Sequence, residues 1–175
     1  MSDSSPRQPT IGVVGLGSMG YGAAVSAHRR GFVTWGLDPR PEARDRFAAD
    51  GGRVTASLPE LAAACDVVVV LVVNAAQTEA VLFGDEGLAA HLRRGSVVVA
   101  SATVDPALPP QWESRLAARG LHLIDGPVSG GAKKAADGQM TVMASGRPEA
   151  FAAAGEALDA IAGKVYRLGD KAGPG

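Results

Sequence analysis

The stretch IGVVGLGSMG, residues 11–20, joins an apolar run of β-branched residues to a glycine-rich turn and the start of a helical pattern. Its glycines have the spacing G-x-G-x-x-G. In that spacing the first glycine permits a tight turn, the second lets the backbone approach a pyrophosphate, and the third lets the helix pack close to the sheet. The stretch therefore predicts a strand, a turn and a helix that bind a dinucleotide, although a turn shaped only by packing would also use these glycines.

The helix after this turn begins with main-chain N–H groups that have no partner inside the helix. The amides of Gly17, Ser18 and Met19 are expected to point at the diphosphate of a dinucleotide, where the helix dipole adds to the attraction. The loop residues predicted to contact the cofactor are Gly15, Leu16, Gly17, Ser18, Met19 and Gly20.

Apolar runs alternate with alanine-rich helical stretches along most of the chain. The apolar runs are Ile11–Val14, Val33–Asp38, Val67–Val73, Val97–Ala100, Leu121–Asp125 and Met140–Ala144, and a predicted strand at Lys164–Leu168 closes the pattern. The helical stretches are Met19–Arg30, Pro41–Ala49, Leu58–Ala64, Ala76–Phe83, Leu108–Arg119 and Glu149–Ala162. Continuously apolar strands are typical of parallel sheets that are buried on both faces. The pattern predicts an α/β fold with a doubly wound, mostly parallel Rossmann-type sheet and helices on both faces.

Length and composition limit the alternatives. The 175 residues suffice for one domain with its own core, and 46% hydrophobic residues with only 5% aromatic residues predict an aliphatic core. The 17 basic and 18 acidic residues nearly balance, which argues against nucleic acid or an anionic membrane as partner. We expect a disordered tail over residues 1–9, a dinucleotide-binding domain over 10–168 and the start of an interdomain linker over 169–175.

Three features predict a cytoplasmic location. Cys65 is the single cysteine, so it cannot form an internal disulfide, as is usual in a reducing compartment. The opening residues MSDSSPRQP are polar, unlike the charged and then apolar pattern of a signal peptide. The longest apolar run, Val67–Val73, is too short to cross a bilayer.

Asp38 ends the second apolar run, about twenty residues beyond the glycine turn, where dinucleotide-binding folds place the carboxylate that binds the adenosine ribose. A 2′-phosphate would meet like charge there, so Asp38 favours NAD over NADP. Two alternatives stay open. Asp38 also suits a turn before Pro39, and the guanidinium of Arg40 is able to pair with a 2′-phosphate.

Polar residues also follow the later strands, at the edge where open α/β sheets bind ligands. Asn74 and Thr103 are predicted to hydrogen-bond the nicotinamide ribose or carboxamide. Each also suits a helix cap, Asn74 for the next helix and Thr103 for the helix near Pro106.

The stretch DGPVSGGAKKAADG, residues 125–138, follows the apolar run that ends at Asp125. Ser129 presents a hydroxyl beside the amides of Gly130 and Gly131, which carry no side chains. Successive amides near a helix start bind carboxylates. The stretch therefore predicts a site for a small carboxylate substrate next to the nicotinamide.

The motifs GLGSMG (residues 15–20) and DGPVSGGAKKAADGQM (residues 125–140) together resemble the two signatures of the β-hydroxyacid dehydrogenase family, which includes 3-hydroxyisobutyrate and L-threonate dehydrogenases. VVNAAQTEAVLFG (residues 72–84) looks most similar to the L-threonate branch. The resemblance implies substrate contacts from Ser129, Gly130 and Gly131, and NAD contacts from Val72, Val73, Asn74 and Thr103. Ala102 departs from the family, which usually has a serine there.

The resemblance implies no catalytic residue within this chain. The family's catalytic lysine lies in a G-x-x-x-K-x-x-N segment that opens a helical second domain, and that segment is expected beyond Gly175. Lys171 does not match it, and the paired Lys133 and Lys134 are more typical of a solvated helix face. The family also implies that the full-length parent is a homo-oligomer.

Three functions are compatible with these features. The first is the NAD-binding domain of an oxidoreductase that transfers hydride between NAD and a small 3-hydroxy acid or sugar acid, inactive by itself. The second is an imine or semialdehyde reductase of the same architecture. The third is an NAD-binding module without catalysis. No metal site is predicted.

Overall fold

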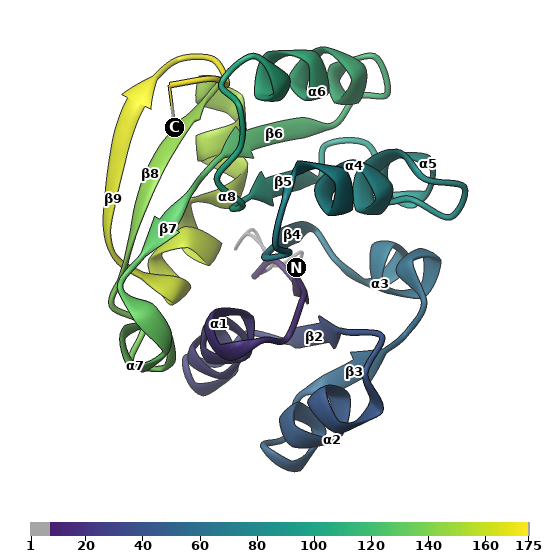
Figure 1. Cartoon of the computed structure of the whole chain (residues 1–175), viewed down its shortest axis with the longest axis vertical. Helices are drawn as coiled ribbons and strands as arrows, with labels where there is room; N and C mark the ends of the chain where they lie inside the picture. The colour runs from purple at the N-terminus through teal and green to yellow at the C-terminus, as the bar shows by residue number, and fades with distance from the viewer. Residues whose placement is uncertain (1–7, 175) are drawn as a thin grey trace, which may run out of the picture.

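Strand β1 (Ile11–Val14) lies inside a sheet, with a parallel neighbour on each side, in the computed structural model of the chain (Figure 1). The structure describes residues 8–174, so residues 1–7 of the expected tail and Gly175 lie outside it. In this range the strand order is β3-β2-β1-β4-β5-β6-β8-β7, with β9 paired to β8. The other strands are β2 (Thr34–Leu37), β3 (Arg53–Thr55), β4 (Val67–Val70), β5 (Val97–Ala100), β6 (His122–Asp125), β7 (Val128–Ser129), β8 (Met140–Gly146) and β9 (Ala162–Gly169).

All strand pairs from β3 to β6 are parallel. Their order is that of a doubly wound dinucleotide-binding sheet, in which the chain starts in the middle and builds outward in both directions. The predicted fold class is confirmed.

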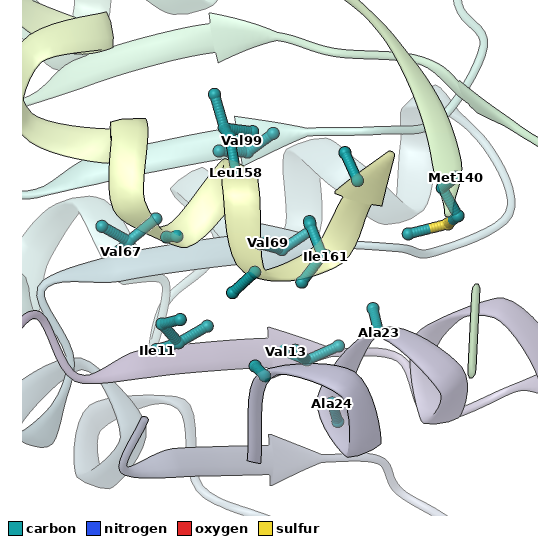
Figure 2. Close-up of a cluster of buried hydrophobic side chains, with 14 of the residues drawn as sticks. Ile11, Val13, Ala23, Ala24, Val67, Val69, Val99, Met140, Leu158 and Ile161 are labelled. Carbon is teal, nitrogen blue, oxygen red and sulfur yellow. The ribbon is translucent and has the colours of Figure 1, made fainter. Parts of the chain in front are cut away.

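The sheet is buried on both faces, as the continuously apolar strands predicted. Val67 and Val69 of β4 face one hydrophobic cluster, and Val68 and Val70 face the other. Figure 2 shows part of the first cluster, where alternate residues of the central strands meet Ala23 and Ala24 of one helix and Leu158 and Ile161 of another. Because successive side chains of a strand point to opposite faces, an all-apolar strand needs helices on both sides.

The helices divide between the two faces of the sheet. The eight helices of the described chain are α1 (Ser18–Arg29), α2 (Pro41–Ala49), α3 (Leu58–Ala64), α4 (Ala75–Phe83), α5 (Leu88–His91), α6 (Leu108–Ala117), α7 (Gly131–Ala136) and α8 (Pro148–Ile161). Helices α1, α2, α7 and α8 contribute to the first cluster, and α3 to α6 contribute to the second. The six long helices lie within two residues of their predicted ends.

Beyond β6 the sheet is no longer uniformly parallel. Strand β8 runs antiparallel to β6 and to β7, and β9 pairs with β8 in parallel after the crossover through α8. The apolar run at Met140–Ala144 predicted a strand but did not specify its direction, because direction depends on where the connection from β6 leads. The short elements β3, β7 and α5 were not predicted, since two to four residues carry no periodic pattern.

The start of the predicted linker packs on the domain. Ala172 is buried, its amide donates to Glu113 Oε2 (3.1 Å), and the amide of Gly173 donates to Asp125 Oδ2 (3.3 Å). Separately, no helix within residues 8–174 is long and apolar enough to span a membrane.

Helix α7 packs against α1 through a glycine. A Cβ at Gly22 would lie 2.6 Å from Ala136 N and 2.7 Å from the Ala135 side chain, which is closer than real contacts allow. The two helices lie side by side (Figure 1). This contact attaches the residue 125–138 stretch to the helix that begins at the glycine turn.

We expect Gly22→Ala to lower the free energy of unfolding by ~1–3 kcal/mol, because the added methyl group overpacks the α1–α7 contact. The same substitution at Gly155 of α8, where a Cβ would meet nothing within 4 Å, is expected to raise it by up to ~1 kcal/mol. Urea denaturation of both variants measures the difference. Equal effects at the two sites would contradict the packing argument.

Candidate cofactor site

The carboxyl ends of the parallel strands form one continuous edge, which main-chain hydrogen bonds extend into the loops. The donors and acceptors along it are Gly15 N to Leu37 O (2.8 Å), Leu71 N to Val14 O (2.8 Å), Ser101 N to Val70 O (3.0 Å) and Gly126 N to Ala100 O (2.8 Å). The loops that begin at these donors are those predicted to bind ligands. They therefore stand in a row along the edge.

The three glycines of the turn meet three different requirements. Gly15 has a φ of +96°, and a Cβ there would lie 2.5 Å from Leu71 O. A Cβ at Gly20 would lie 1.7 Å from Gly15 O, so α1 lies closer to the turn than any residue with a side chain at position 20 would allow. Gly17 has open space around it, and its backbone is exposed at the start of α1. Only Gly17 leaves room for a diphosphate against the backbone.

Asp38 joins the end of β2 to the glycine turn. Its Oδ2 accepts a hydrogen bond from Leu16 N (2.9 Å), and its Oδ1 accepts one from Arg40 N (3.0 Å). The second bond is the turn role that the sequence left open for Asp38. The guanidinium of Arg40 forms a fork with the same carboxylate, from Nε to Oδ1 (2.9 Å) and from Nη2 to Oδ2 (3.1 Å).

The charge of Asp38 is stabilised by these donors. The side-chain hydrogen bonds from Arg40 lower the pKa of Asp38 to about 2, and the amides of Arg40 and Leu16 act in the same direction. Burial of the carboxyl group opposes them. Asp38 is therefore ionised over the whole physiological range.

A cleft of about 630 Å³ opens between the glycine turn, the end of β2 and helix α4. Its lining includes the charged residues Asp38 and Arg40 at the end of β2 and the apolar residues Ala80 and Val81 of α4. This division suits an adenosine, whose base is flat and largely apolar and whose ribose carries two hydroxyl groups. Five of the predicted contact residues line the cleft: Gly15, Gly17, Asp38, Val72 and Val73.

Two further predicted contacts lie at the same edge but not in the lining of the cleft. Asn74 caps α4, because its Oδ1 accepts from Gln77 N (2.9 Å), so the capping alternative is confirmed for this residue. Thr103 is exposed in the loop after β5 and does not cap α6. Asp105 serves that loop instead, with its Oδ1 accepting from Ala107 N (2.9 Å).

The predicted substrate residues lie where β7 passes into α7. Ser129 is exposed at the end of β7, and Gly130 and Gly131 have φ values of +127° and +77°, which favour glycine. The stem of Lys134 lies beside Gly130, whereas Lys133 is 93% exposed and pairs with Asp137 (3.9 Å). Of the two lysines, Lys134 is thus the nearer to the predicted substrate loop.

Sequence reasoning missed the wall of the cleft that α4 supplies. Gln77, Ala80 and Val81 occupy positions i, i+3 and i+4 of one helix face, and this spacing is the signal that could have identified them. Gln77 also accepts from Val73 N (2.9 Å) and so holds the loop after β4. Among residues 8–174 no group of three or more His, Cys, Asp or Glu side chains is arranged to hold a metal ion.

Residues 10–169 match the protein family described as the NAD binding domain of 6-phosphogluconate dehydrogenase. The chain belongs to this family. The prediction that the chain is a dinucleotide-binding domain is therefore confirmed.

Curated relatives and solved structures agree with this assignment. L-threonate dehydrogenase from Cupriavidus necator is 55% identical over 165 residues, which are 94% of this chain and 56% of that protein. The structure of 3-hydroxyisobutyrate dehydrogenase from Salmonella typhimurium superposes with a TM-score of 0.91 at 47% identity, over 95% of this chain and 58% of that one. An imine reductase from Myxococcus stipitatus in complex with NAD+ has a TM-score of 0.87 at 21% identity, over 96% of this chain and 57% of that one, which is a likeness of fold alone.

The NAD-binding domain spans little more than half the length of these relatives. The resemblance to β-hydroxyacid dehydrogenases is confirmed by their names. The assignment of individual residues to cofactor and substrate stays a prediction.

We expect Asp38→Asn to lower the free energy of unfolding by ~1 kcal/mol at pH 7, because it removes the charge that Arg40 and two amides stabilise. A carboxyl group whose pKa is lowered on folding stabilises the folded state above its unfolded pKa, and this contribution is lost as the pH falls. The difference should therefore shrink between about pH 5 and about pH 2.

Urea denaturation at pH 7 and pH 3 measures this change. Asp45→Asn, an exposed aspartate on α2, is the matched control for the loss of one negative charge. A deficit of Asp38→Asn that is the same at both pH values would contradict the electrostatic explanation.

Proposed function

We propose that this NAD-binding domain serves an oxidoreductase that transfers hydride between NAD and a small 3-hydroxy acid or sugar acid of the L-threonate or 3-hydroxyisobutyrate type. The observation that carries the proposal is the proximity of the two signature stretches. Helix α7, which begins at Gly131 directly after Ser129 and Gly130, packs on α1, which begins at the glycine turn. No side chain at Gly22 separates the two helices. The names of the relatives support the substrate class.

The adenosine half of NAD is assigned to the cleft of 630 Å³. The amides of Gly17, Ser18 and Met19 at the start of α1 would hold the diphosphate. Asp38 would accept from the ribose hydroxyls, which favours NAD over NADP. The nicotinamide half would follow the edge past Val72, Val73 and Asn74 to Thr103.

The substrate is assigned to the loop between β7 and α7. Bound NAD supplies the hydride acceptor at its nicotinamide ring. The Ser129 hydroxyl and the amides of Gly130 and Gly131 would hold the substrate carboxylate, so that its carbinol carbon faces the ring. The absence of side chains at both glycines would let ring and substrate come close together.

Proton exchange at the substrate hydroxyl needs a group with a pKa near the working pH. We propose that a lysine outside the NAD-binding domain exchanges this proton, in the part of the relatives' length that this chain does not cover. We also propose that the parent protein acts as a cytoplasmic homo-oligomer. The NAD-binding domain by itself is then expected to bind cofactor without turnover. Two other functions remain candidates. One is an imine or semialdehyde reductase, since the imine reductase from Myxococcus stipitatus has the same fold. The other is a non-catalytic NAD-binding module.

We expect Gly17→Val to abolish NADH binding without unfolding the domain. Gly17 has a φ of −67° and nothing within 4 Å of a Cβ, so a valine fits the folded chain but occupies the diphosphate site. Fluorescence titration with NADH and a thermal melt measure the two effects. Gly155→Val, the same substitution at an open glycine of α8, is the control that should keep NADH binding. Retained binding in Gly17→Val would contradict the assignment of the diphosphate site.

We expect the 175-residue chain to bind NADH but to have no dehydrogenase activity. With NAD and either L-threonate or 3-hydroxyisobutyrate, it should form no NADH. Positioned acid or base catalysis typically contributes ~10²–10⁴-fold to a rate, and no lysine has been assigned that task in this chain. Absorbance at the NADH band measures turnover. Turnover that Lys134→Met abolishes would instead identify the proton-exchanging group beside Gly130.

A further inference from the structure

Another hollow lies away from the cofactor cleft, where helices α4, α5 and α6 come together (Figure 1). Its volume is about 280 Å³, near the lower end of the range for small-molecule pockets. Because α6 runs from the end of β5 to the start of β6, its carboxyl end lies opposite to the edge that carries the cofactor loops. The apolar lining includes Leu82, Phe83, Ala89 and Ala90, and the charged lining consists of Arg115 and Arg119.

Arg115 is held at the side of this hollow by an aromatic ring. Its guanidinium Cζ lies 3.6 Å from the centroid of the Phe83 ring. Such stacking uses the face of the planar guanidinium, whereas its N–H donors lie in the plane of the group. The donors of Arg115 therefore stay available to an acceptor while the group itself is held in place.

Two further guanidinium groups lie near Arg115. Arg119 follows it by four residues, so both lie on one face of the helix end, and both line the hollow. Arg94 lies against the adjoining loop, since a Cβ at Gly120 would lie 2.8 Å from its Cζ. The amide of Gly95 donates to Gly120 O (2.8 Å) and joins the two loops. Three positive charges thus gather at this corner of the domain.

These guanidinium groups have no acidic partner in the described part of the chain. Within residues 8–174 the ion pairs include none of Arg94, Arg115 and Arg119. Glu79, the acidic residue of α4, accepts instead from Trp112 Nε1 (3.0 Å). The dipole of α6 favours positive charge at this end, yet like charges on one helix face repel one another. A negatively charged ligand would pair with the donors and offset that repulsion.

We propose that this hollow binds a small organic anion, whose carboxylate or phosphate group pairs with Arg115 and Arg119 and whose apolar body lies against α4 and α5. Carboxylate and phosphate share the geometry that a guanidinium recognises through paired N–H donors. The apolar part of the lining favours an anion with a hydrocarbon or aromatic body over a free inorganic ion. The inference is independent of the proposed function, because this site uses none of the cofactor residues.

The test is an amide NMR titration of the isotope-labelled chain at constant ionic strength, with benzoate, phenyl phosphate and neutral benzamide as probes. We expect at least one of the two anions to cause saturable shifts of the amides of residues 82–84, 89–90 and 115–119. Benzamide resembles benzoate in shape but has no charge, so it should bind at least about tenfold more weakly than the preferred anion. The anion that binds more tightly identifies the site as one for carboxylates or for phosphates.

Arg115→Gln and Arg119→Gln should each weaken binding of that anion by at least about threefold, because each removes a charge-assisted contact. Arg29→Gln is the matched control. Arg29 is an exposed arginine in the last turn of α1, which packs on the other face of the sheet. Its loss removes one positive charge from a helix end and should leave the affinity within about twofold, since salt screens distant charges.

The inference would be overturned by the absence of saturable shifts with both anions, by shifts confined to the glycine turn, or by equal binding of benzamide. An equal loss of affinity in Arg29→Gln would also overturn it, because attraction by net charge alone would then explain the binding. Anion binding that only the two variants at the end of α6 weaken would establish the site. The amide spectra show whether each variant is folded, so a loss of binding is not confused with unfolding.

Discussion

The close approach of helix α1 to its neighbours is the constraint on which the arrangement of the site depends. A side chain at Gly20 would overlap the carbonyl of Gly15, and one at Gly22 would overlap the backbone of α7. Without side chains at these positions, the amino-terminal end of α1 lies against the carboxyl end of β1 after only a short turn. Helix α7 packs against the same helix at Gly22. The glycine at position 20 thus determines the shape of the cofactor loop. The glycine at position 22 allows the serine- and glycine-containing stretch to lie beside that loop.

Asp38 connects the local structure with recognition. Its carboxylate accepts from the amide of Leu16, which holds the glycine turn against the end of β2, and from the amide of Arg40, which starts the turn into α2. The carboxylate that is predicted to bind the adenosine ribose therefore also stabilises the loop it belongs to.

Much of the central fold could be predicted because its signals are local. Strand β1 and helix α2 have the bounds expected from apolar runs and helical stretches. Gly31 and Gly120, which follow the ends of two helices, have the positive φ that is typical of such positions. The run Val67–Val73 was predicted as one strand, yet β4 ends at Val70 and Val73 is 82% exposed. Hydrophobicity alone does not mark that end, because the chain leaves the sheet where the neighbouring strands end.

For the candidate site, the sequence by itself determined the local backbone form of the loops that are predicted to carry the chemistry. The glycine spacing, the acidic residue at the end of β2 and the serine–glycine stretch each lie within a short segment of the sequence. A turn or a helix start depends mainly on the residues of such a segment. The tertiary structure alone decided the direction of β8, the apolar wall from α4, the contact of α7 with α1 and the pairing of Arg40 with Asp38. Strand direction and the α4 and α7 contacts join segments that are distant in sequence, and the Arg40 fork depends on how the turn after β2 aims one side chain back into the cleft. Periodicity and glycine conformation reveal local backbone shape, but only packing determines which side chains share a site.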